Sequence, residues 1–60
     1  MLKIKEYRIK NNYTQRYIAY KLGVSQQAVG KWENGENVPS LKHLITLSAL
    51  IGCQIEELIR

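Results

Sequence analysis

The fold of this chain depends on the stretch Leu22-Gly23-Val24-Ser25-Gln26-Gln27-Ala28-Val29-Gly30-Lys31-Trp32-Glu33. Gly23 can adopt the left-handed backbone conformation that ends a helix, and Ser25 can accept a backbone N–H as the N-cap of the next helix. The residues before the turn carry apolar side chains at helical spacing, and Thr14 is a suitable N-cap for them. The sequence therefore predicts two helices joined by a three-residue turn.

The second of these helices has a polar face and an apolar face. At about 100° per residue, an arc of about 140° carries no apolar side chain, whereas Val29 and Trp32 lie on the opposite side. A solvated helix face more often carries Glu and Lys pairs four residues apart. This arc carries amides, one glycine and one cation instead: Gln26, Gln27, Gly30, Lys31 and Asn34.

These residue types suit the major groove of duplex DNA. A glutamine amide offers a donor and an acceptor, which match N6 and N7 of adenine, and Lys31 can reach guanine or a phosphate. Gly30 costs about 0.5–1 kcal/mol relative to alanine inside a helix, and close approach of the backbone to another molecule would explain that cost. Drift at an exposed site is the alternative explanation for Gly30. We predict that Gln26, Gln27, Gly30 and Lys31 read bases.

The pattern as a whole resembles the Cro and lambda-repressor-like helix-turn-helix domains, also called the xenobiotic-response-element type. The resemblance runs from Ile4 to Ile59 and rests on the turn, on Trp32-Glu33-Asn34-Gly35 and on Pro39-Ser40 at matching spacings. Gly30 departs from the family, which more often carries serine or another polar residue there. Further matching positions are Arg8, Thr14, Gln15, Ile18, Ala19, Leu41, Leu44, Ile51 and Gly52.

The resemblance implies a DNA-binding transcriptional regulator, and we expect a repressor that reads the major groove with its third helix. By the same resemblance, Arg8 and Glu33 form a partly buried ion pair with a structural role; two solvated charges are the alternative. Helix N-termini are natural anion sites. We expect phosphate contacts from six residues, namely Thr14, Gln15, Arg16, Asn34, Ser40 and Lys42.

Helical spacing predicts an all-α fold of five helices in one domain over residues 1–60. The first helix is expected over Leu2–Lys10. A fourth follows the cap Ser40 and buries a stripe made of Leu41, Leu44, Leu47, Ser48 and Ile51, with His43 on the surface. A short last helix carries Ile55, Leu58 and Ile59. We assign the four tyrosines mostly to packing.

Composition agrees with this interpretation. The net charge of +4 favours a polyanionic partner, and 60 residues leave little room for a catalytic cleft. One cysteine cannot form an internal disulfide, which favours a reducing cytoplasm, and Cys53 is expected to be a small core residue. We expect no signal peptide and no membrane helix. His43 and Cys53 match no catalytic or metal-binding spacing, so we expect no enzyme, no cofactor and no metal.

A protein-interaction module of the same fold, such as an antitoxin-like partner or an adaptor, is the main alternative function. An exposed apolar face would indicate it. The same kind of face could join two copies of a DNA-binding domain instead. For a weak homodimer we expect a surface on the fourth and fifth helices made of Ala49, Leu50, Ile55 and Ile59.

Overall fold

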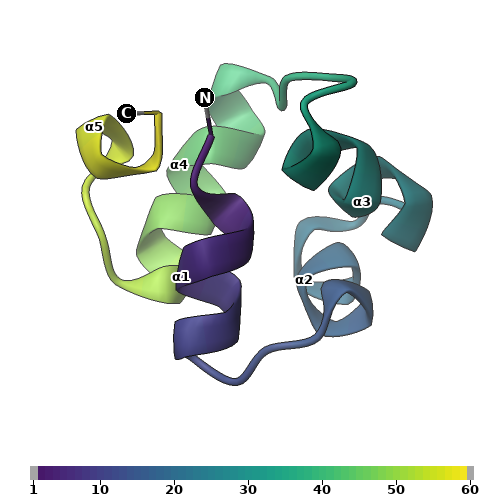
Figure 1. Cartoon of the computed structure of the whole chain (residues 1–60), viewed down its shortest axis with the longest axis horizontal. Coiled ribbons are helices and arrows are strands. Elements are labelled where there is room, and N and C mark those ends of the chain that lie inside the picture. Colours follow the sequence, from purple (N-terminus) through teal and green to yellow (C-terminus); the bar gives the residue numbers. More distant parts are fainter. Residues whose placement is uncertain (1, 60) are drawn as a thin grey trace.

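The computed structural model describes residues 2–59, and every element of secondary structure in that range is a helix. α2 and α3 lie together on one side of the molecule, α5 lies on the opposite side, and α1 and α4 lie between them (Figure 1). This architecture confirms the predicted all-α fold. The five helices are α1 (Ile4–Lys10), α2 (Gln15–Leu22), α3 (Gln26–Asn34), α4 (Leu41–Ile51) and α5 (Ile55–Leu58).

Hydroxyl caps begin the three longest helices. Thr14 and Ser25 each accept a backbone N–H from the first turn of the helix that follows, at 2.9 and 3.1 Å. Ser40 does the same for α4 at 3.4 Å. Gly23 ends α2 in the left-handed region, with φ at 71°. The caps and the turn between α2 and α3 are thus as predicted from the sequence.

An apolar core joins all five helices. Helices of 4 to 11 residues are too short to be stable in isolation, so their packed apolar faces supply most of their stability. Trp32 of α3 is only 6% exposed, and the aliphatic side chains around it come from every other helix. The buried members are Ile4, Ile18, Ala19, Val29, Trp32, Leu47, Ile51 and Leu58.

The first helix is shorter than predicted. It begins at Ile4, and Leu2 and Lys3 precede it. The backbone N–H of Lys3 donates to the carbonyl oxygen of Leu58 at 2.7 Å, so this segment is bonded to the end of α5. A bond between residues so far apart in the chain leaves no signal in local helical spacing.

The prediction for α4 was wrong about its edges. Leu41 is 67% exposed, because it lies about 120° around the helix from the fully buried Leu47. Leu50 lies on the other edge and packs against the core, so it is not the free surface that we expected. His43 is half-buried, with its ring centre 5.5 Å from that of Trp32. Tyr20, assigned to packing, is 80% exposed.

A buried carboxylate connects the first three helices. Arg8 of α1 donates to both oxygens of Glu33 in α3, from Nε at 2.6 Å and from Nη2 at 3.2 Å. The third guanidinium nitrogen, Nη1, donates to the carbonyl oxygen of Tyr13 in the α1–α2 loop at 2.9 Å. The Glu33 side chain is 2% exposed and that of Arg8 is 13% exposed. The two charges are therefore paired inside the protein and are not solvated.

Substitution of Arg8 by Met should lower the free energy of unfolding by about 3–5 kcal/mol, because it leaves the Glu33 carboxylate buried without its cation. Urea denaturation followed by circular dichroism measures this. Lys5→Met is the matched control, since Lys5 is exposed on the same helix and should change stability by about 0.5 kcal/mol or less. Equal effects of the two substitutions would contradict a stabilising ion pair.

Candidate nucleic-acid interface

The exposed side of α3 is polar along its whole length. Gln26 and Gln27 form its first turn, directly after the cap Ser25, and both side chains are exposed. Lys31 and Asn34 continue the exposed surface toward the end of the helix. The opposite side contributes Val29 and Trp32 to the core. α3 is thus held by its apolar face while its amides and one cation remain free to contact another molecule.

Gly30 differs from the other predicted base-reading residues because it is half-buried. A Cβ atom added at this position would lie 3.8 Å from both Nε2 and Oε1 of Gln15, the first residue of α2. That distance is an ordinary van der Waals contact. The Gln15 amide therefore lies against the backbone of α3 at the point where α3 has no side chain.

Gln15 is also tied to the buried ion pair. Its Nε2 donates to Oε1 of Glu33 at 2.9 Å. The sequence predicted Gln15 as a phosphate contact and gave no sign of this bond, because the two residues are 18 positions apart and belong to different helices. The absence of a side chain at residue 30 was the available clue, since it leaves room for a neighbour.

Apart from Asn34, which is the last residue of α3, the remaining predicted phosphate contacts lie at or near helix starts. Thr14 caps α2, and Arg16 is exposed in its first turn. Ser40 caps α4, and its Oγ is also 3.2 Å from Nδ1 of His43. Lys42 is exposed in the first turn of α4. These helix ends combine free backbone N–H groups with exposed cations, a combination that suits anions.

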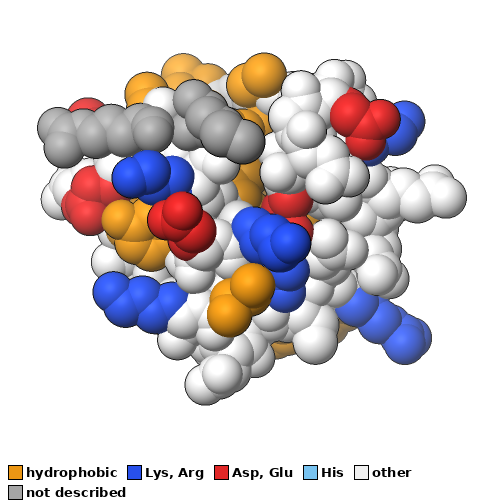
Figure 2. Space-filling model, in the orientation of Figure 1, with side chains coloured by type: hydrophobic (Ala, Val, Ile, Leu, Met, Phe, Trp, Pro, Cys, Tyr) orange, Lys and Arg blue, Asp and Glu red, His pale blue; other side chains and the backbone are white. Residues whose placement is uncertain are grey.

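A second exposed surface is apolar and includes the start of α4. Figure 2 shows hydrophobic side chains along the upper edge of the molecule, above this helix start. Val38, Leu41 and Ile45 are 75%, 67% and 52% exposed. Of the residues expected in a dimer surface, Ala49 and Ile59 are exposed, whereas Leu50 and Ile55 are half-buried. The exposed apolar area therefore lies nearer to the α3–α4 loop than the sequence predicted.

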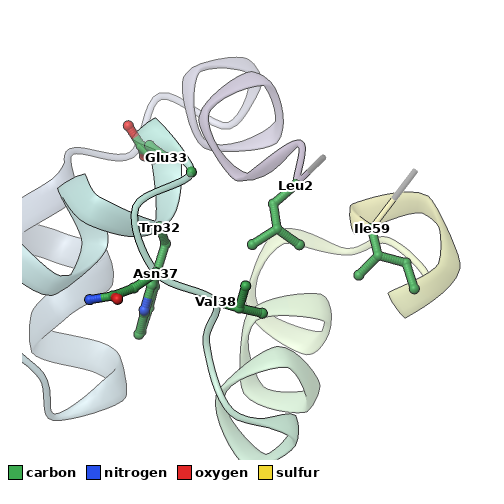
Figure 3. A pocket seen from close by; sticks show the side chains of 7 residues that line it. Leu2, Trp32, Glu33, Asn37, Val38 and Ile59 are labelled. Atoms are coloured by element: carbon green, nitrogen blue, oxygen red, sulfur yellow. The ribbon is translucent and has the colours of Figure 1, made fainter.

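A shallow pocket of about 410 Å³ lies between the N-terminal segment, the α3–α4 loop and the end of α5. Leu2, Val38 and Ile59 line it with hydrocarbon, while the Glu33 carboxylate points away from these side chains (Figure 3). Trp32, Gly35 and Asn37 complete the lining. Among the described residues, Glu33 is the one charged residue of the lining, and its carboxylate is bonded to Arg8 and Gln15.

The free thiol of Cys53 is partly buried beside α5 and lies near the Glu57 carboxylate. Burial raises the pKa of the Cys53 thiol, and the nearby Glu57 carboxylate raises it further, so the thiol is a poor nucleophile. Among residues 2–59, no three His, Cys, Asp or Glu side chains gather closely enough to hold a metal ion. In the same range, no helix is both long enough and apolar enough to cross a membrane.

Comparison with known proteins finds relatives that are all named as HTH-type transcriptional regulators or activators. An uncharacterized HTH-type transcriptional regulator of Methanocaldococcus jannaschii is 41% identical over 56 residues, which are 93% of this chain and 85% of that protein. The chain spans only 28% to 54% of three longer HTH-type regulators that it also matches.

Two solved structures with bound DNA have nearly the same fold. The biofilm regulator SinR, known from Bacillus subtilis, in complex with DNA has a TM-score of 0.85 at 27% identity, over 97% of this chain and 94% of that one. The P22 c2 repressor with a synthetic operator has a TM-score of 0.84 at 30% identity, over 90% and 82% of the two chains. The family model described as helix-turn-helix matches residues 4–58. With the turn, the caps and the exposed polar face of α3 in place, this chain belongs to the helix-turn-helix family, of the Cro and lambda-repressor type.

Proposed function

We propose that this chain binds duplex DNA in a sequence-specific manner as a transcriptional regulator, and that it acts as a repressor. The exposed polar face of α3 carries the proposal, because it presents two amides and a cation from a helix whose other side is fixed in the core. A helix held in this way fits the width of the major groove. The DNA-bound structures of SinR and of the P22 c2 repressor support the same assignment.

Within this proposal, some residues contact the DNA bases and others contact the DNA backbone. Gln26, Gln27 and Lys31 would contact base edges, and Gly30, which lies between Gln26 and Gln27 on the same arc, would leave room for them. The contacts to the DNA backbone would come from residues at the helix starts and at the end of α3, namely Thr14, Gln15, Arg16, Asn34, Ser40 and Lys42. Phosphate contacts orient the protein on DNA, whereas base contacts determine which sequence is preferred.

We also propose that the chain works in the cytoplasm and has no catalytic activity of its own. The family supports both statements, since the relatives are named as transcriptional regulators. The raised pKa of the Cys53 thiol supports the second, because a thiol that is harder to deprotonate is a weaker nucleophile.

A homodimer on DNA is the partner arrangement that the exposed apolar side chains favour. Val38, Leu41 and Ile45 are too few for an interface of standard size, which buries about 800 Å² per partner. They suffice for a contact that forms when two copies occupy neighbouring half-sites about 34–36 Å apart. A protein-interaction module, such as an antitoxin-like partner or an adaptor, would use the same surface without binding DNA. A measurement of DNA binding therefore distinguishes this function from that of a transcriptional regulator.

Substitution of Gln26 or Gln27 by Ala should weaken binding to a preferred duplex by about 1–3 kcal/mol and relax the preference for adenine. The preferred duplex comes from selection among random sequences, and affinities are then compared on this duplex and on a random one. An equal loss on both duplexes would argue against base reading by these glutamines.

Substitution of Arg16 or Lys42 by Ala should weaken binding to all duplexes alike and reduce the slope of log affinity against log salt by about one unit per lost phosphate contact. Titrations at several salt concentrations give the slope. Lys5→Ala is the control, because it removes the same charge from α1, outside the proposed interface. A slope that falls equally in the control would mean that only net charge matters.

Substitution of Ile45 by Glu should abolish the gain in affinity that a two-site operator has over a single half-site, while half-site binding persists. The substitution removes apolar contact at the dimer surface, and it would bury the new carboxylate there without a partner. Ile9→Glu makes the same change at a residue of α1 with nearly the same exposure, 54% against 52%, and should keep the gain. A gain that survives in both variants would place the contact elsewhere.

A further inference from the structure

His43 lies between the cap of α4 and the core. It is half-buried in the first turn of α4, three residues after the cap Ser40. Its ring centre is 5.5 Å from that of Trp32, which is 6% exposed, so packing against α3 limits how far the ring can turn. The ring nitrogen Nδ1 is 3.2 Å from Oγ of Ser40. His43 therefore presents Nδ1 to a hydroxyl that we expect to contact DNA.

The protonation state of His43 decides which way the Ser40 hydroxyl donates. Oγ of Ser40 already accepts the backbone N–H of His43 as the helix cap, at 3.4 Å. A neutral ring with its proton on Nε2 can only accept at Nδ1, so the Ser40 O–H donates inward to it. A protonated ring must donate from Nδ1, so Oγ accepts twice and its O–H is released to donate outward. Protonation thus makes outward donation the only arrangement that satisfies both groups.

An outward hydroxyl donor suits a phosphate oxygen of the DNA backbone. An ionised phosphate oxygen only accepts hydrogen bonds, so a Ser40 O–H that is used inward cannot bind it. The start of α4 adds free backbone N–H groups, which favour the same anion. A helix start by itself disfavours a cation, whereas an adjacent phosphate favours one. Phosphate binding at Ser40 and protonation of His43 therefore favour each other.

The charges around the ring leave this coupling to the DNA. Among residues 2–59, the one ion pair joins Arg8 and Glu33, so no carboxylate lies within ion-pair distance of His43. His43 is also the one histidine of the chain, and histidine ordinarily changes charge between about pH 5 and 8. The charged residues of α3, of the α3–α4 loop and of the first turn of α4 are Lys31, Glu33, Glu36 and Lys42.

We propose that His43 is a positioning residue for DNA binding: when protonated, it turns the Ser40 hydroxyl outward to a backbone phosphate and so makes DNA affinity depend on pH. This inference rests on the proposed function in DNA binding. The bound state holds the extra proton, so affinity is greatest below about pH 6 and falls as the pH rises toward about 8. Ser40 makes the contact, and His43 acts through it.

DNA affinity measured against pH at constant salt tests this proposal in the full-length chain. The unaltered chain should bind a selected duplex about tenfold more tightly at about pH 5.5 than at about pH 8, which is the size expected for a hydrogen bond to a charged group. The same ratio is expected on a random duplex, because a phosphate contact carries no base preference.

Two substitutions of His43 separate the hydrogen bond from the packing of the ring. His43→Phe keeps a ring against Trp32 and removes the donor, so its affinity should stay low across the pH range. His43→Asn places an amide N–H near the position of Nδ1 and does not titrate, so it should bind with high affinity across the range. Urea unfolding of each variant shows whether stability has changed.

Ser40→Gly separates positioning from direct attraction between a protonated histidine and DNA. Glycine is nearly as good a helix cap as serine, so α4 should remain in place. If His43 acts through the hydroxyl, Ser40→Gly should abolish the pH dependence. The double variant of Ser40→Gly with His43→Phe should then bind within about twofold of Ser40→Gly alone.

Several results would overturn the inference. A pH dependence that survives in Ser40→Gly would show that His43 attracts DNA by charge alone, and one that survives in His43→Phe would show that another group titrates. Binding of the unaltered chain with no pH dependence would remove the inference and leave the proposed function intact. If the unaltered chain did not bind duplex DNA at any pH, both would fail.

Discussion

The carboxylate of Glu33 holds together elements that local sequence cannot connect. It accepts hydrogen bonds from Arg8 of α1 and Gln15 of α2, while its own backbone belongs to α3. A buried charge is tolerated only when it is paired and its oxygens are bonded, so each of these donors stabilises the position of the others. Together with the core contacts between α2 and α3, this small group of bonds holds the two helices in place and sets the direction of the polar face of α3.

Much of the fold could be predicted because its signals are local. Thr14, Ser25 and Ser40 act within one turn of their own helices, and Gly23 needs only its own backbone conformation. The edges of α4 were harder to predict, since apolar residues such as Leu41 and Leu50 surround more than half of that helix. Which edge is covered depends on how α4 docks, and this is a tertiary property.

The candidate site likewise combines features that local sequence predicts with features that depend on tertiary packing. The exposed amides of α3 follow from helical periodicity and were predicted by residue number. Two contacts could not be predicted from the sequence, because each joins residues from two helices: the bond between Gln15 and Glu33 and the contact between Gln15 and Gly30. A glycine that looked like an isolated weakness in the sequence is, in the structure, the space into which a neighbouring helix extends its first side chain.

The backbone hydrogen bond between Lys3 and Leu58 joins the first and last described segments of the chain. Lys3 and Leu58 are separated by nearly the whole described chain, so closing a loop of this length in the unfolded chain has a large entropic cost, which the packing of the helices between them offsets. α5 is one turn long, so it is stabilised by this link and by the buried Leu58 side chain rather than by its own hydrogen bonds. Opening of the segment at Lys3 should therefore loosen α5, and opening of α5 should loosen that segment in turn.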